Sequence, residues 1–136
     1  MTALTFTVPG HAAPQGSKRH IGNGQMIESS REVGPWRERV ALAARAATTQ
    51  MFTGAVVVRI DFVLRRPLST PKRSTPPAIK KPDVDKLARA VLDALTDVLL
   101  DDDSRVVELR TRKRLAEIGE SPRADITVTD ELGVWV

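Results

Sequence analysis

Aspartates gather in one short stretch of this chain, and their number and spacing indicate divalent-metal chemistry. Seven of them fall within the 21 residues 83–103, although the whole chain of 136 residues has only 17 acidic residues. They are Asp83, Asp85, Asp93, Asp97, Asp101, Asp102 and Asp103. Carboxylate oxygens suit Mg²⁺ and Mn²⁺, and a metal held in this way can activate water against a phosphodiester. This stretch is therefore the candidate site.

The run Asp101-Asp102-Asp103 is the part of the stretch that is hardest to explain without a bound cation. We expect it just after the end of a helix, where the helix dipole disfavours anions, and adjacent carboxylates also repel each other. A bound divalent cation offsets both costs. A strand that begins near residue 104 and runs beside the start of the helix would bring Asp103 to Asp83 and Asp85.

The aspartates before this run also have ordinary explanations. Asp83 could cap the start of a helix, and Asp85 could complement the helix dipole in the first turn. Arg89 lies four residues from both Asp85 and Asp93, so it could form routine surface pairs worth about 0.2–0.5 kcal/mol each. These alternatives remain open from the residues alone.

The elements that must position these residues follow from hydrophobic periodicity. Alternation predicts strands at residues 4–8, 54–65, 105–115 and 124–128. Helical spacing predicts one helix entered at 29–34 and running to about 50, and a second, amphipathic helix from 83 to about 98. We expect Trp36 to anchor the core, with Leu87, Val91, Ala94, Leu95 and Val98 as the buried stripe of the second helix. Length and the absence of repeats indicate one domain, residues 1–136.

The rest of the chain is basic, which favours a polyanionic partner. The net charge is +4, and the sequence pI is about 10.0. The segment 65–81 carries six basic residues and four prolines without any acid, so we expect a flexible basic loop beside the site. A Gly-rich loop near residue 20 adds further cations. The candidate DNA-binding residues are Lys18, Arg19, Arg65, Arg66, Lys72, Arg73, Lys80, Lys81 and Lys113.

Two absences narrow the function. The chain has no cysteine, which excludes disulfides, thiolate catalysis and Cys-ligated metal sites. No apolar run reaches the length of a membrane span, and the start lacks the features of a signal peptide, so a cytoplasmic location without a membrane partner is expected.

The ordered motifs resemble the RusA family of Holliday-junction resolvases from bacteria and phages. The matching pattern is K-P-D-V-D at 81–85, L-D-A-L at 92–95 and D-D-S-R-V-V at 102–107, with Lys113 closing it. F-T-V-P-G followed by A-P-Q-G-S-K-R also resembles the N-terminal strand and basic loop of the family.

The resemblance implies a small α/β domain of α+β two-layer type, with a mixed sheet and about two main helices packed on it. It implies a homodimer that makes paired, Mg²⁺-dependent incisions in four-way DNA junctions, with Mn²⁺ as a possible substitute. Asp83, Asp85 and Asp103 match the metal-binding catalytic aspartates, and Asp102 matches the first residue of an Asp-Asp pair and is a fourth candidate metal ligand. Arg89 stands where some members carry a catalytic lysine. A two-fold dimer also suits a substrate with two equivalent strands.

Three other functions remain as alternatives. The first is a non-enzymatic or decayed recombination accessory protein that binds branched DNA. The second is a nucleotide-sugar enzyme with a D-x-D motif, for which the chain is short because such an enzyme needs a nucleotide-binding domain. The third is a nuclease with a different DNA substrate.

Overall fold

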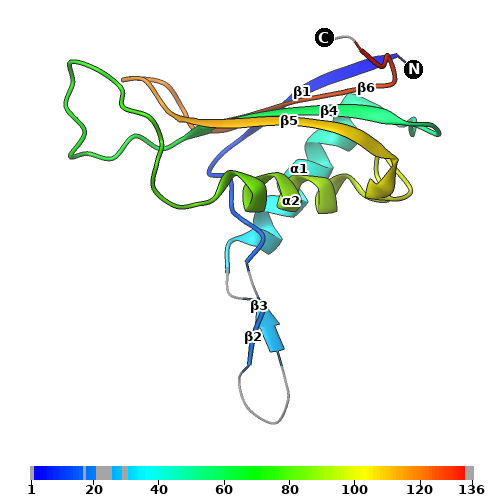
Figure 1. Ribbon diagram of the computed structural model, residues 1–136, viewed down its shortest axis with the longest axis horizontal. Helices are drawn as coiled ribbons and strands as arrows, with labels where there is room; N and C mark the ends of the chain where they lie inside the picture. Colours follow the sequence, from blue (N-terminus) through cyan, green and yellow to red (C-terminus); the bar gives the residue numbers. More distant parts are fainter. Residues whose placement is uncertain (1, 17, 21–25, 29–30, 134–136) are drawn as a thin grey trace.

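The fold has two layers, a four-stranded sheet and a pair of helices that covers one of its faces (Figure 1). The computed structural model describes residues 2–16, 18–20, 26–28 and 31–133, and the segments 18–20 and 26–28 are described by their backbone alone. The sheet comprises β1 (Ala3–Pro9), β4 (Val56–Leu64), β5 (Val106–Leu115) and β6 (Arg123–Thr129). The helices are α1 (Val33–Ala47) and α2 (Val84–Leu95), and η1 (Asp103–Arg105) is a single 3₁₀ turn. This arrangement confirms the expected small α/β fold with a mixed sheet and two main helices.

The strand order is β1-β6-β4-β5, and only β4 and β5 run parallel. Parallel neighbours need a crossover connection, and α2 provides it. α2 therefore runs antiparallel to both strands, and β5 begins close to the end of α2 (Figure 1). The start of α2 consequently lies beside the carboxyl ends of β4 and β5.

The core lies between the sheet and the helices, as the periodicity predicted. Trp36 is 2% exposed and belongs to the core cluster that also contains the inward residues of β4 and β6. The predicted stripe of α2 is buried except for its last member, Val98, which is partly buried. The main core side chains are Val40, Val58, Ile60, Phe62, Leu87, Val91, Leu95, Ala124, Ile126 and Val128.

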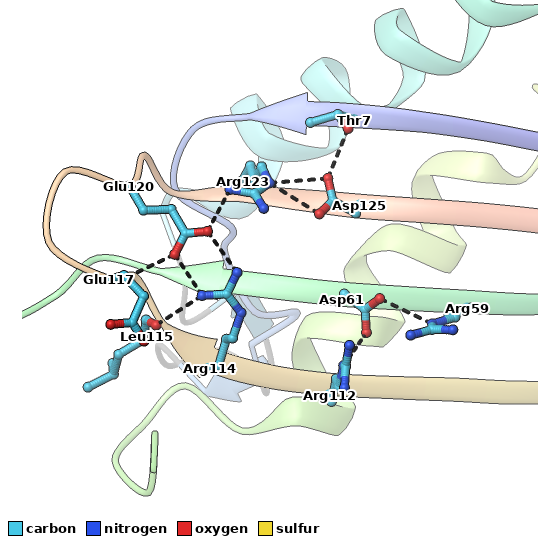
Figure 2. A network of polar contacts seen from close by, with 10 residues as sticks. All are labelled: Thr7, Arg59, Asp61, Arg112, Arg114, Leu115, Glu117, Glu120, Arg123 and Asp125. Atoms are coloured by element: carbon cyan, nitrogen blue, oxygen red, sulfur yellow. Dashed lines mark hydrogen bonds and ion pairs between the residues drawn. The ribbon is translucent and has the colours of Figure 1, made fainter. Parts of the chain in front are cut away.

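The opposite face of the sheet is polar, and its charges form the network of Figure 2. Asp61 on β4 accepts hydrogen bonds from Arg59 at 3.1 Å and from Arg112 at 2.7 Å. Glu120 accepts bonds from Arg114 and Arg123, which joins the ends of β5 and β6. The Arg114 guanidinium and the Glu117 backbone N–H hold the pKa of Glu120 well below its usual range. Arg59 and Asp61, which alternate with buried neighbours along β4, therefore lie on this polar face.

Two local features differ from the expectations. α2 ends at Leu95 rather than near Val98, because Thr96 is extended and Asp97 has a positive φ of 68°, which turns the chain toward β5. The Gly-rich loop contains a short hairpin, β2 (Lys18–His20) and β3 (Met26–Glu28), that periodicity did not predict because three-residue strands carry too few side chains to show alternation. No helix within the described part of the chain is long and apolar enough to cross a membrane.

Candidate active site

A cleft of about 690 Å³ opens at the start of α2. Two parts of the chain line it: one contains Lys81, Pro82, Asp83 and Lys86, and the other contains residues 11–14 and 16 together with Glu32. The Gln15 N–H donates to the Lys86 carbonyl at 2.9 Å, so this segment is tied to α2. Ligands in α/β proteins commonly bind at the carboxyl ends of parallel strands, and the N-terminus of a helix favours anions. The position is suitable for a phosphate group.

Neither the Asp83 carboxylate nor the Asp85 carboxylate accepts a hydrogen bond from a described residue. The backbone carbonyl of Asp83 accepts the Leu87 N–H at 3.0 Å, but the Asp83 side chain does not cap the helix. That side chain is half exposed, and its one ion-pair partner among the described residues is Lys86, at 3.8 Å. The carboxylate of Asp85, exposed in the first turn of α2, makes no hydrogen bond or ion pair with any described residue.

Arg89 is the next residue along the exposed face of α2, and the surface pairs considered for it do not form. Within the described part of the chain, its guanidinium contacts neither Asp85 nor Asp93. Asp93 instead faces Arg37 of α1, at 3.7 Å. An ordinary surface pair therefore does not account for Arg89, which is one turn beyond Asp85.

The structure separates the roles of the three adjacent aspartates. Asp101 forms two hydrogen bonds with the Arg105 guanidinium, which lower the pKa of Asp101. Asp102 accepts the Ser104 N–H at 2.9 Å as the cap of η1, and hydrogen bonding by the Ser104 side chain and then by its backbone N–H lowers the pKa of Asp102. Asp103 is exposed, and its carboxylate has no partner among the residues that the structure describes. Of the three, Asp103 is the one left for a ligand.

Asp103 does not return to Asp83 within one chain, contrary to the expected path of the chain. η1 follows the end of α2 and precedes β5, whereas Asp83 stands at the start of α2. A helix of 12 residues is about 18 Å long, so α2 holds the two carboxylates apart by roughly that length. Accordingly, the described residues contain no group of three or more acidic or histidine side chains close enough to hold a metal ion.

The cations predicted to bind DNA fall into three groups. Arg65, Lys72, Arg73, Lys80 and Lys81 are exposed on the segment 65–81. Arg66 and Lys113 instead hold the fold: Arg66 bonds Thr75 and three backbone carbonyls at 2.5 to 3.4 Å, and Lys113 bonds the carbonyls of Lys80 and Pro82. Lys18 and Arg19 lie in β2, and their side chains are outside the described part of the structure.

Sequence reasoning missed three residues that line the cleft with Asp83. Lys86 is three residues after Asp83, a helical spacing that could have identified it. His11 and Glu32 reach the cleft from the loop after β1 and from the residue before α1. No local pattern marks these two, because they reach the cleft only through the tertiary fold, from segments far in sequence from Asp83.

Comparison with known proteins agrees with the motifs. The family model described as Endodeoxyribonuclease RusA matches residues 9–129. An uncharacterized protein, YqaN of Bacillus subtilis (strain 168), is 31% identical over 144 residues, which cover 96% of this chain and 98% of that protein. The family match includes every strand of the main sheet at least in part, both helices and all the candidate aspartates. The chain therefore belongs to the RusA endodeoxyribonuclease family.

Proposed function

We propose that this protein is a metal-dependent endonuclease that resolves four-way DNA junctions by paired, symmetric incisions. The main observation in favour is that Asp83, Asp85 and Arg89 follow one another along the start of α2 without structural partners that explain them, beside a cleft. Membership of an endodeoxyribonuclease family gives that arrangement its chemistry. The proposed substrate is branched DNA within the cytoplasm.

The proposed metal ligands are Asp83, Asp85 and Asp103. Asp102, the neighbour of Asp103, would support them without being the main ligand. Asp85 and Asp103 have no partner among the described residues, and Asp83 has only Lys86, at 3.8 Å. Such carboxylates suit Mg²⁺ or Mn²⁺, which would supply an activated water and a Lewis acid for the phosphodiester. Because one chain presents only Asp83 and Asp85 at the start of α2, a complete set requires a carboxylate from elsewhere.

We assign that carboxylate to Asp103 of a second copy. A two-fold axis that pairs the α2 helices in opposite directions would set the start of each helix beside the end of the other. β5 is an edge strand, and its Val107 and Leu109 are 61% and 42% exposed. Contact between these apolar side chains of two copies would favour such a dimer. The dimer would then carry two equivalent sites for two equivalent strands.

Arg89 and the basic segments have separate roles in this proposal. Arg89, exposed one turn beyond Asp85, would stabilise negative charge on the scissile phosphate, although its guanidinium is planar where some relatives carry a compact ammonium. The exposed cations of the segment 65–81 would hold the DNA backbone without reading its sequence.

Cleavage of an end-labelled synthetic four-way junction tests the proposal, with linear duplex of the same sequence as the control. We expect symmetric nicks in the junction only, and only when Mg²⁺ or Mn²⁺ is present. Tight binding of the junction without cleavage in either metal would favour an accessory protein that binds branched DNA. Equal cleavage of the duplex would show a nuclease with a different substrate.

A further inference from the structure

A second cleft, of about 640 Å³, adjoins the cleft that contains Asp83. The two share His11, Ala12, Lys81 and Pro82 in their walls. Most residues that line the second cleft belong to the loop that connects β4 to α2. This loop, drawn in green in Figure 1, extends beyond the end of the sheet. A DNA strand that reaches Asp83 would therefore pass close to this second cleft.

The walls of the second cleft are apolar, and its rim is basic. Leu64 and Leu115, neighbours in the register of β4 and β5, line it together with Pro76, Pro77 and Ile79. Arg65, Lys80 and Lys81 also line it and are exposed. Among the described residues that line the cleft, none is acidic. The combination suits a ligand with an apolar body and negative charge beside it.

Hydrogen bonds at both ends hold the loop over this cleft. At one end the Arg66 guanidinium binds Thr75 and the carbonyls of Pro71, Ser74 and Ala116, and Thr75 donates to Glu117 at 2.7 Å. At the other end the Lys113 ammonium binds the carbonyls of Lys80 and Pro82, both at 2.8 Å. These bonds fix the backbone around Pro76, Pro77 and Ile79. The apolar side chains of these residues therefore stay at the cleft and accessible to a ligand.

A nucleotide of the DNA matches this chemistry. A displaced base would contact the proline rings and Ile79, whose side chain is 86% exposed, while its flanking phosphates would contact Arg65, Lys80 and Lys81. Unstacking a base costs a few kcal/mol in continuous duplex and less where pairing is already disturbed, as at the centre of a junction. We propose that this cleft holds one nucleobase displaced from the DNA next to the cleavage site, an inference that rests on the proposed nuclease function.

Junctions that carry 2-aminopurine, a fluorescent adenine analogue whose emission rises when it leaves the base stack, test this inference. The analogue is placed in turn at each position near the exchange point, and the protein is added in Ca²⁺ so that binding is measured without Mg²⁺. We expect wild-type protein to raise the emission at one position on each of two symmetry-related strands.

Two variants of the loop supply the matched comparison. Ile79→Ser removes apolar surface from the cleft, whereas Leu68→Ser changes a residue of the same loop that is 93% exposed and does not line the cleft. Ile79→Ser should abolish the rise in emission and weaken junction binding about fivefold, a loss within that expected for one exposed branched side chain. Leu68→Ser should leave both unchanged. Ala78→Phe, which fills the cleft, should act as Ile79→Ser does.

The outcomes separate this inference from the proposed function. If wild-type protein cleaves the junction in Mg²⁺ but raises the emission at no position, the base-binding cleft is wrong and the nuclease proposal stands. The cleft is also wrong if Ile79→Ser and Leu68→Ser behave alike. If wild-type protein neither binds nor cleaves the junction, both proposals fail together.

Discussion

Lys113 and Pro82, 31 residues apart in the sequence, are joined by a 2.8 Å hydrogen bond from the lysine ammonium to the proline carbonyl. A second bond of 2.8 Å runs from the same ammonium to the Lys80 carbonyl. β5 thereby holds the backbone just before Asp83, the first residue of the candidate site. Lys113 matches the family pattern, and the structure gives it a positioning role at the start of α2.

Replacing Lys113 by Met should destabilise the protein and impair the site. The change leaves two carbonyls without their donor, at a cost of about 1–3 kcal/mol in the free energy of unfolding. Urea denaturation measures this loss, and junction cleavage should fall with it. Arg112→Met is the control, because Arg112 is 71% exposed and its pair with Asp61 should contribute less than about 1 kcal/mol. Equal stability of the two variants would contradict the positioning role.

The aspartate variants should divide according to the partners seen in the structure. Asp83→Asn, Asp85→Asn and Asp103→Asn should each lower the cleavage rate by at least about a hundredfold and leave junction binding largely intact. A loss of this size exceeds the one typical for a residue that only hydrogen-bonds a metal ligand. Asp101→Asn should keep most of the activity, because Asp101 pairs with Arg105. Rates under single-turnover conditions distinguish these cases. Equal losses for Asp101→Asn and Asp103→Asn would contradict the assignment within the triplet.

The elements of the fold could be predicted from the sequence, but the assembly of the site could not. Apolar spacing placed both helices and the four strands of the main sheet because burial of one face controls those residues. The same spacing could not show whether β5 begins beside the start of α2 or beside its end. The turn at Asp97 sends β5 back from the end of α2, so Asp103 stays far from Asp83. His11 and Glu32 join the cleft through tertiary packing alone.

Mg²⁺ or Mn²⁺ should raise the melting temperature if the carboxylates bind metal in the folded state. Ligand that binds the native state at a hundred times its Kd stabilises it by about 2.7 kcal/mol. Thermal unfolding in Ca²⁺-free buffer with increasing Mg²⁺ measures this effect. The control is NaCl added to the same ionic strength. The rise should be absent in Asp85→Asn. The same rise in the variant would place the metal elsewhere.

Glu120 should make the stability depend on pH in acid. Its pKa is lowered in the folded protein by Arg114 and the Glu117 N–H, so its stabilising contribution is complete above the ordinary carboxyl pKa of about 4.3 and is lost as the pH falls toward the lower folded value. Glu120→Gln should therefore be less stable than wild type at pH 7, and the difference should shrink by pH 3. Urea denaturation at both pH values checks this. A difference that grows in acid would contradict the network of Figure 2.

The central claim, that two copies complete each metal site, is tested most directly by mixing subunits. The Asp85→Asn and Asp103→Asn chains are co-expressed with different tags, and the dimer that carries both tags is purified and given an end-labelled four-way junction with Mg²⁺. If sites are shared, this dimer has one site with both changes and one intact site, so it should nick one strand although each variant alone is inactive. If wild-type protein resolves the junction and the mixed dimer makes no nick, the shared site is contradicted.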